Sequence, residues 1–259
     1  MCNPSTTKMA SSRPGSGTMA DSPTGSDKPS GRRMLEDLHN PFLPLDERTP
    51  ATPQWEAKRE LAQTLRDYTE ALMTSTPTPE QMSAMNQWLQ DATAQLEQSP
   101  RVYGRSGYTE AGEGSFGEVF QEVGPLCGHS NPIAPPLEMW AEGETAYARV
   151  TMGWRYEGPP GCVHGGFVAA LFDEFLGMAQ FMGGHPGMTG TLTIRYRQPT
   201  PLNVPLEMSA WIDRSEGRKT FVSGKIEANG HVTAECEGIF IRPNQPVTAL
   251  RDAVMAEKS

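Results

Sequence analysis

Six short runs of alternating apolar and polar residues, interrupted by one long helical pattern, constrain the fold of this chain most. The alternating runs lie around 137–142, 145–152, 189–197, 204–212, 219–227 and 231–241, and the helical pattern lies at 164–182. Alternation with a period of two is typical of strands that bury one face. Two strands, one helix and four further strands predict an α+β fold, in which a single antiparallel sheet carries a helix against one face.

Turn residues and side-chain alternation support this sheet. Glu216-Gly217 and Asn229-Gly230 separate the last three runs. Asn-Gly favours a two-residue hairpin turn because it tolerates positive φ at both central positions. In the third run, one face of the strand is expected to carry Leu192, Ile194 and Tyr196, and the other Thr193, Arg195 and Arg197.

The first 124 residues differ from the rest of the chain in composition and in predicted secondary structure. Residues 1–34 contain no Leu, Ile, Val or aromatic residue, so they cannot bury enough apolar area to offset their ordering entropy. They are predicted to form a disordered tail. Residues 35–124 are interpreted as a helical extension that ends in a linker at 99–124, residues 125–243 as the sheet domain, and residues 244–259 as a C-terminal tail.

Two amphipathic helices are expected in the extension. Thr52-Pro53 offers a cap followed by proline at the first helical position, and Thr78 with Gln81 matches a capping box. The first helix carries apolar residues at Leu61, Leu65, Tyr68 and Leu72, and the second at Met82, Met85, Leu89, Ala92 and Leu96. We therefore expect a helical hairpin whose apolar face covers another part of the protein.

Composition and charge exclude several kinds of protein. A formal net charge of -9 argues against a general nucleic-acid binder, because no surplus of cations is present to neutralise phosphates. The 4 cysteines form no CxxC pair and the 5 histidines form no HExxH motif, which predicts no structural zinc or other metal site. No stretch approaches the about 20 apolar residues of a membrane helix, so we expect a cytoplasmic protein without a membrane span.

The segment 158–184 carries the residues most indicative of a functional site. Glycines and prolines lead into His164-Gly165-Gly166, and Gly183-Gly184 close the helix. One stripe of this helix is apolar and holds Phe167, Leu171, Phe175, Met178 and Met182. A second stripe is small or polar and holds Gly166, Ala169, Ala170, Asp173, Gly177 and Gln180.

Glycines at a helix start leave backbone N–H groups unpaired at the positive end of the helix dipole. Such donors could hold the oxygen of a reacting carbonyl and the oxyanion that develops on it. By itself, the pattern fits a simple glycine-rich turn equally well. The residues alone leave both readings open.

Three segments resemble the PaaI-type hotdog acyl-CoA thioesterases, close to their THEM4-like branch. They are YEGPPGCVHGGFVAALFDEFLG, TGTLTIRYRQPTPL (189–202) and EGRKTFVSGKIEANGHVTAECEGIFI (216–241), and their core signature is HGG with an aspartate nine residues after the histidine. The resemblance implies a hotdog fold, in which a curved antiparallel sheet wraps a long central helix. It also implies homodimers, often assembled further, with active sites at the subunit interface and no cofactor.

The resemblance assigns roles to four residues. It implies that Asp173 acts as general base or nucleophile in the hydrolysis of an acyl-CoA thioester, and that the backbone N–H of Gly165 polarises the thioester carbonyl. Thr189 would place the attacking water or the carboxylate. His164 would position the loop, without being the usual base. The sequence does not choose between the general-base and the nucleophilic route.

Helix geometry supports a site shared by two copies of the chain. Asp173 lies about 13.5 Å along the helix axis from His164. One helix therefore cannot bring Gly165 and Asp173 to the same carbonyl carbon, which needs both within about 3.5 Å. Two antiparallel copies of the helix can, so we predict composite sites in a homodimer or higher homo-oligomer.

The CoA part of the substrate carries phosphates, so cations should line the way out of the site. Arg195 and Arg197 share one strand face, and Arg218-Lys219 match a position that contacts CoA in the family that this chain resembles. Gly166 and Phe167 are further candidates for substrate binding, with the acyl tail running along Phe167, Leu171 and Phe175.

Two residues depart from or complicate the thioesterase pattern, and two other functions are alternatives to it. Some relatives carry an asparagine that contacts the thioester six residues before the histidine, where this chain has Gly158. Glu174 follows Asp173 but points about 100° away, so only one of them should face the substrate. A hotdog hydratase or dehydratase using His164, and a non-catalytic acyl-CoA-binding or regulatory protein, are the alternatives to a thioesterase.

Overall fold

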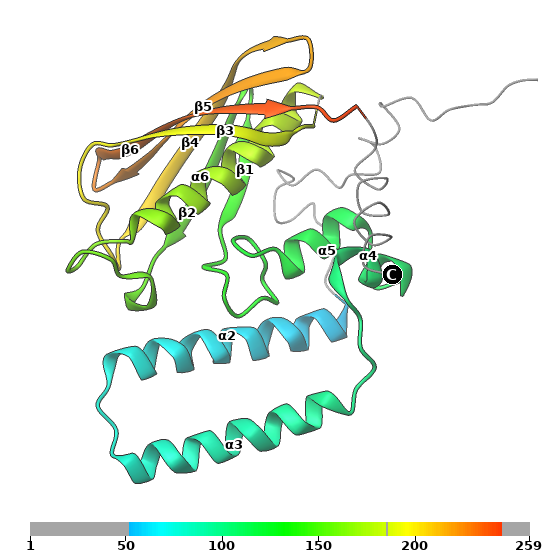
Figure 1. The fold of residues 1–259 in the computed structure, drawn as a ribbon, viewed down its shortest axis with the longest axis vertical. Helices are drawn as coiled ribbons and strands as arrows, with labels where there is room; N and C mark the ends of the chain where they lie inside the picture. The colour runs from blue at the N-terminus through cyan, green and yellow to red at the C-terminus, as the bar shows by residue number, and fades with distance from the viewer. Residues whose placement is uncertain (1–51, 185, 245–259) are drawn as a thin grey trace, which may run out of the picture.

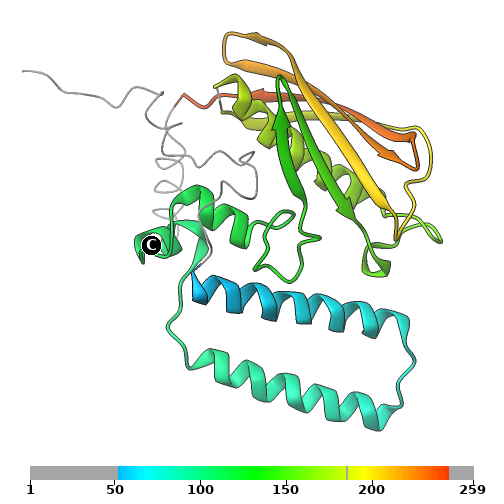
Figure 2. The same ribbon diagram turned by 180° about the vertical axis from the view of Figure 1, so that it is seen from behind.

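The computed structural model describes residues 52–184 and 186–244 (Figure 1). The tail predicted at 1–34 lies outside the described residues, as does all of the C-terminal tail except its first residue. Within the described part, an upper layer of sheet and helix stands on a lower layer of helices (Figures 1 and 2).

Six strands form one antiparallel sheet in the order β1-β2-β4-β5-β6-β3. They are β1 (Glu138–Glu142), β2 (Thr145–Thr151), β3 (Met188–Tyr196), β4 (Pro205–Glu216), β5 (Lys219–Ala228) and β6 (His231–Ile241). Each predicted run overlaps one strand, so the α+β prediction is confirmed. Asn229 and Gly230 have φ of 53° and 77°, as the hairpin turn between β5 and β6 requires.

Helix α6 (Gly165–Ala179) packs against one face of this sheet and continues into the short η3 turn (Gln180–Gly183) (Figure 1). Its buried side chains, Val168, Leu171, Phe172, Phe175, Leu176 and Ala179, join the core that the inward face of the sheet provides. Of the predicted apolar stripe, Leu171 and Phe175 are fully buried, but Phe167 is 37% exposed. The buried side also holds Phe172 and Leu176, which lay outside that stripe. The helix is apolar on several sides, so its period alone did not give the full extent of the buried side.

Gln180, a member of the small or polar stripe, is buried. Its Nε2 donates to the carbonyl oxygens of Gly177 and Gly187 at 3.0 and 2.8 Å. Its Oε1 accepts the N–H of Gly187 at 2.8 Å. This amide side chain therefore fastens the loop that leads from α6 into β3.

Between residue 52 and the first strand, the described structure has four helices: α2 (Pro53–Thr74), α3 (Pro79–Glu97), α4 (Gly104–Glu110) and α5 (Phe116–Val123). The caps predicted for the first two are confirmed, since Thr52 accepts the N–H of Trp55 and Thr78 forms a reciprocal capping box with Gln81. The linker predicted at 99–124 is wrong, because α4 and α5 lie within it. A capping box of Ser115 and Glu118 starts α5 and was the signal for it.

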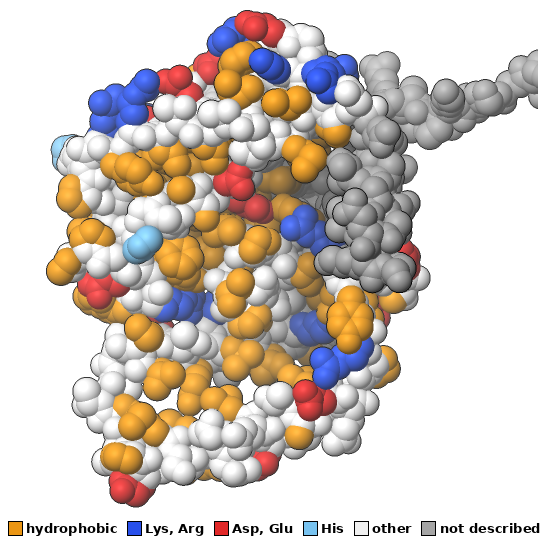
Figure 3. Space-filling model, viewed as in Figure 1, with side chains coloured by type: hydrophobic (Ala, Val, Ile, Leu, Met, Phe, Trp, Pro, Cys, Tyr) orange, Lys and Arg blue, Asp and Glu red, His pale blue; other side chains and the backbone are white. Residues whose placement is uncertain are grey.

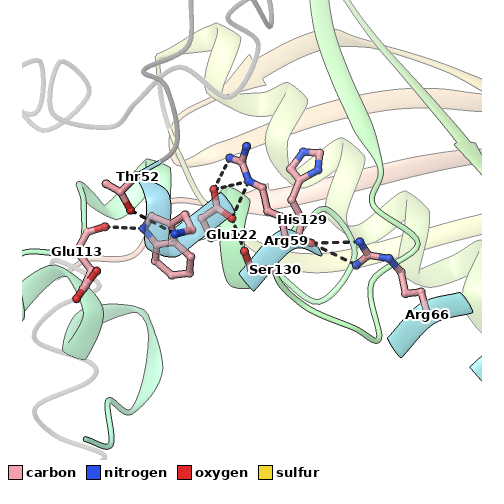
Figure 4. Close-up of polar contacts among 8 residues, drawn as sticks. Thr52, Arg59, Arg66, Glu113, Glu122, His129 and Ser130 are labelled. Carbon is pink, nitrogen blue, oxygen red and sulfur yellow. Dashed lines mark hydrogen bonds and ion pairs between the residues drawn. The ribbon is translucent and has the colours of Figure 1, made fainter. Parts of the chain in front are cut away.

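Helix α2 docks on the rest of the molecule through polar contacts rather than through its apolar stripe (Figure 4). Trp55 Nε1 donates to the Glu113 carbonyl at 2.8 Å, Arg59 pairs with Glu122, and Arg66 donates to the carbonyl of His129. Leu61 and Leu72, which were expected to cover another surface, are 47% and 46% exposed.

Helix α3 has no buried residue in the described structure. Figure 3 shows apolar side chains along both α2 and α3 on the viewed face. The expected hairpin is present, but its apolar stripes do not cover the sheet domain, which corrects that part of the prediction. Among residues 52–184 and 186–244, no helix is both long enough and apolar enough to cross a membrane.

Candidate active site

The start of α6 leaves one backbone donor uncommitted. His164 caps the helix with its ring, whose Nδ1 accepts the N–H of Gly166 at 3.0 Å, and its carbonyl accepts the N–H groups of Phe167 and Val168. The N–H of His164 itself donates to the carbonyl of Tyr156 at 2.9 Å. Within the described residues, the N–H of Gly165 has no acceptor. It lies at the positive end of the helix dipole, where a developing negative charge is stabilised.

Tyr196 holds the same helical turn from the side. Its hydroxyl donates to the Gly165 carbonyl at 2.9 Å. A Cβ atom added to Gly165 would lie 3.5 Å from that hydroxyl oxygen, an ordinary contact. Nothing within the described chain therefore demands a glycine here.

Asp173 lies in the middle of α6 with its side chain exposed. Thr189, at the start of β3, donates its hydroxyl hydrogen to Asp173 Oδ1 at 2.7 Å. The two predicted residues are thus brought together from elements 16 residues apart. A hydroxyl donor on one carboxylate oxygen orients the group and leaves the other oxygen available for a proton or for an acyl carbon.

A β-bulge at Gly190 aims Thr189 at Asp173. Thr189 pairs with Phe240, which is buried beneath α6, whereas Thr191 pairs with Ile239 on the next row. In a regular strand Thr189 and Thr191 would share a face, but the extra residue turns Thr189 towards the helix. A Cβ on Gly190 would lie 2.8 Å from Ile241 Cδ1 and 3.3 Å from the carbonyl oxygen of Ile239, so a larger residue would have to displace the Ile241 side chain. Sequence reasoning missed the bulge, although a glycine within an alternating run was a signal.

Glu174 points away from this surface. It is partly buried, and its Oε1 accepts the thiol hydrogen of Cys127 at 3.2 Å. Burial raises the pKa of its carboxyl, and the neighbouring charge of Asp173 adds to the effect. Of the two adjacent carboxylates, only Asp173 faces outwards.

A single chain does not unite the two halves of this site. Gly165 and Asp173 are eight residues apart on one continuous helix, which corresponds to about 12 Å along its axis. The two groups are held by opposite parts of the same strand, because Tyr196 near the end of β3 contacts Gly165 and Thr189 near its start contacts Asp173.

Comparison with known proteins identifies the family. The family model for the thioesterase superfamily matches residues 160–235, which contain Gly165, Asp173 and Thr189. The solved structure of RHA08564, a thioesterase superfamily protein, is 30% identical with a TM-score of 0.62, and the alignment covers 74% of this chain and 97% of that one. This chain belongs to the thioesterase superfamily. The hotdog fold expected from the resemblance is confirmed.

Curated relatives match about a third of this thioesterase-superfamily chain. Acyl-coenzyme A thioesterase THEM4 of Rattus norvegicus is 36% identical over 100 residues, covering 37% of this chain and 43% of that protein. Acyl-coenzyme A thioesterase THEM5 of Homo sapiens is 32% identical over 88 residues, covering 33% and 36%. The chain thus spans less than half the length of these relatives.

In this superfamily member, the predicted CoA cations are not gathered around Asp173. Arg195 pairs with Glu237 at 2.6 Å and Arg197 with Glu235 at 2.6 Å, on the strand face opposite to that of Leu192 and Ile194. Both pairs are exposed and therefore contribute little to stability.

The second pair of predicted cations lies at the other end of the sheet. Arg218 donates to Asn244 Oδ1 at 2.6 Å. In the sheet, Lys219 of β5 lies opposite Ile241 of β6, and Ile241 lies opposite Met188 of β3. Lys219 is therefore two strands away from the end of β3 that carries Thr189. Across the described residues, the ammonium of Lys219 has no ionic partner and remains open to an anion.

The surroundings of Gly158 and Phe167 bear on two further predictions for the site of this superfamily member. A Cβ on Gly158 would lie 2.6 Å from His164 Cα, so the asparagine found in some relatives does not fit the present loop. Phe167, predicted to contact the acyl chain, packs its ring edge-on against Tyr156 at 4.8 Å between centroids. Among the described residues, no group of three or more His, Cys, Asp or Glu side chains is arranged to hold a metal ion.

Proposed function

We propose that this protein hydrolyses acyl-CoA thioesters to the free acid and CoA. The observation that carries the proposal is the outward-facing Asp173 carboxylate held by Thr189, on the same helix whose Gly165 N–H has no acceptor within the described chain. A thioester hydrolase needs these two groups, one to activate the nucleophile and one to stabilise the oxyanion. The acyl-CoA substrate is suggested by the names of the curated relatives.

Two routes use the same residues. In the first, Asp173 removes a proton from water, the hydroxide oxygen bonds to the carbonyl carbon, and the carbon–sulfur bond breaks to release the CoA thiolate, which takes up a proton. In the second, an Asp173 oxygen bonds to the carbonyl carbon and displaces the thiolate, and water then hydrolyses the mixed anhydride. The Gly165 N–H stabilises the carbonyl oxygen in both routes.

A homodimer through the edge strand β3 would complete the site. Strand β3 is at one edge of the sheet, has no buried residue, and exposes Met188 and Tyr196 by 53% and 55%. An unpaired edge of this kind is a template for pairing with another strand. Antiparallel pairing of two copies about an axis near Thr193 would bring the Thr189 end of one β3 beside the Tyr196 end of the other.

That pairing would place Gly165 of one copy near Asp173 of the other. The composite site would have an arginine pair on one side and Lys219 on another, so we propose Arg195, Arg197, Arg218 and Lys219 as contacts for the CoA phosphates. Gly166 and Phe167 are proposed to contact the thioester and the acyl tail. We also propose a cytoplasmic location, which the free thiols of Cys127, Cys162 and Cys236 fit because they are typical of a reducing compartment, and a role in lipid metabolism.

Release of free thiol from acetyl-, octanoyl- and palmitoyl-CoA tests the activity. The decisive variant is Gly165→Pro, because proline suits the first position of a helix and has no N–H group to donate. His164 already has the extended φ and ψ of -58° and 132° that a residue before proline adopts. We expect Gly165→Pro to lower kcat by about 100-fold or more.

Gly165→Ala is the matched control, since it adds the same Cβ but keeps the donor, and it should retain most of the activity. Asp173→Asn should abolish turnover. Full activity of Gly165→Pro or of Asp173→Asn would refute the assigned roles. Binding of acyl-CoA without any turnover by the wild type would identify a non-catalytic acyl-CoA-binding protein instead. A hydratase role for His164 is disfavoured, because its Nδ1 is already engaged by the N–H of Gly166.

Mixing two inactive variants tests the composite site. In a mixed dimer of Asp173→Asn and Gly165→Pro chains, one of the two sites has both an intact Gly165 and an intact Asp173. Random exchange of subunits makes half of the dimers mixed, so about a quarter of the wild-type rate should return. If mixing after co-refolding restores nothing, each chain contains its own complete site and the shared arrangement is wrong.

A further inference from the structure

Helix α2 of the N-terminal extension is bonded directly to a turn of the sheet domain. Glu70 Oε1 accepts the N–H of Trp154 at 2.7 Å, across 84 residues of sequence. Arg155, the next residue, donates from Nη1 to the carbonyl of Arg66 at 2.7 Å. Trp154 begins the short η2 turn (Trp154–Tyr156), so two residues of α2 hold two consecutive residues of this turn.

The Glu70 carboxylate lies close to the backbone of Gly153. A Cβ atom on Gly153 would lie 2.6 Å from Glu70 Oε2, so a larger residue there would displace the carboxylate from its present position. Arg66, one turn earlier on α2, is buried and donates to the carbonyls of His129 and Asn131 at 3.0 to 3.3 Å. The contact is therefore one part of an extended polar junction and is not a lone surface hydrogen bond.

The η2 turn in turn supports the start of α6. The carbonyl of Tyr156 accepts the N–H of His164 at 2.9 Å. Tyr156 is buried, its hydroxyl donates to the carbonyl of Ile133 at 3.0 Å, and its ring meets Phe167 edge-on. Glu70 is thus separated from the residue before Gly165 by a three-residue turn and one hydrogen bond at each end.

We infer that Glu70 is a positioning residue, through which the N-terminal helix sets the direction of the Gly165 N–H group. The inference rests on the proposed function, and it assigns a role to the extension. The alignment with RHA08564 covers 74% of the chain, more than residues 125–243 can account for, so part of the extension is shared with that protein. Helix α2 is then a support for the reacting end of α6 as well as an added layer.

The hydrogen bond of Glu70 and the ion pair of Arg59 indicate which substitutions test this inference. Glu70→Ala removes the acceptor for the Trp154 N–H, whereas Glu70→Gln keeps a carbonyl oxygen at the same reach. Arg59→Ala is the matched structural control, because Arg59 lies on the same docking face of α2 but pairs with Glu122, far from the η2 turn in sequence. Small displacements of a catalytic group cost large factors in rate, and we expect Glu70→Ala to lower kcat about tenfold with KM within about twofold.

Glu70→Gln should retain the wild-type kcat. Arg59→Ala should lower the melting temperature while leaving kcat unchanged at temperatures at which it is folded. A wild-type kcat in Glu70→Ala, or an equal loss in Glu70→Ala and Arg59→Ala, would overturn the inference, because the helix would then act only through overall stability.

Backbone hydrogen exchange gives a readout that does not need activity. Glu70→Ala should raise the exchange rate of the His164 amide and of neighbouring amides in 154–166, while Glu70→Gln and Arg59→Ala should match the wild type. Absence of thiol release by the wild type would refute the proposed function alone. Unchanged exchange in Glu70→Ala would refute the positioning role alone.

Discussion

Removal of Arg59 should expose how much of the stability depends on the polar docking of α2. The Glu122 side chain is 5% exposed, and its oxygens accept from Arg59 Nε at 3.1 and 3.2 Å and from Ser130 Oγ at 2.6 Å. Arg59→Ala leaves this buried carboxylate with the Ser130 hydroxyl and without its counter-charge. Breaking a fully buried ion pair costs about 3–5 kcal/mol.

The Arg59 side chain is 41% exposed, so water can partly replace it and the expected loss in the free energy of unfolding is about 2 kcal/mol. For a chain of this size, that loss lowers the melting temperature by roughly 4–8 °C. Thermal and urea denaturation followed by circular dichroism measure both quantities.

The physical cause is tested by adding Glu122→Gln. If the cost of Arg59→Ala comes from a stranded negative charge, neutralising that charge should recover about 1 kcal/mol in the double variant. A single variant within about 0.5 kcal/mol of the wild type, or a double variant less stable than Arg59→Ala, would show that the pair does not anchor the helix.

Three further predictions address the site and its surroundings. Gly190→Ala places a Cβ against the Ile241 side chain, so it should lower the free energy of unfolding by about 1–3 kcal/mol. It should also lower kcat, because it displaces Thr189 from Asp173. Wild-type kinetics would contradict the role of the bulge. The pKa of Glu174 is raised, which means that the folded state favours its neutral form. Its contribution to the stability of the fold is therefore complete below the ordinary carboxyl pKa, and it is lost as the pH rises through the raised pKa. Glu174→Gln should therefore gain more in melting temperature over the wild type at pH 8 than at pH 4, and a gain that is independent of pH would be inconsistent with a buried titrating carboxyl. Thr193→Cys should form a disulfide between two copies under mild oxidation, whereas Thr191→Cys should not, because only the residue near the axis brings its Cα within about 7 Å of its copy. Equal cross-linking of the two variants would place the interface elsewhere.

Local sequence patterns predicted most of the secondary structure of the fold. The alternating runs, the Asn229-Gly230 turn and the caps at Thr52 and Thr78 were readable because strand period, turn conformation and helix capping each depend on a few neighbouring residues. The family resemblance added the residues of the candidate site, and the structure brings Asp173 and Thr189 into hydrogen-bonding contact. That two copies share the site stays a prediction.

Other features depended on distant partners. The bulge that turns Thr189 inwards follows from how β3 pairs with β6, and the exposure of Phe167 follows from which side of a largely apolar helix meets the sheet.

The docking of α2 shows the difference most clearly. The apolar stripe of this helix suggested a hydrophobic contact, yet the buried face is the one with Trp55, Ala62 and Arg66. Periodicity reports which side chains avoid water on average, whereas Glu122 and the Trp154 N–H, which lie far along the chain, decide which side chains find a partner. The sequence by itself therefore determined the six strands, the helices α2, α3 and α6, and the caps of α2 and α3. Tertiary structure decided their orientation, because the free energy of a buried polar contact depends on a partner that no local pattern specifies.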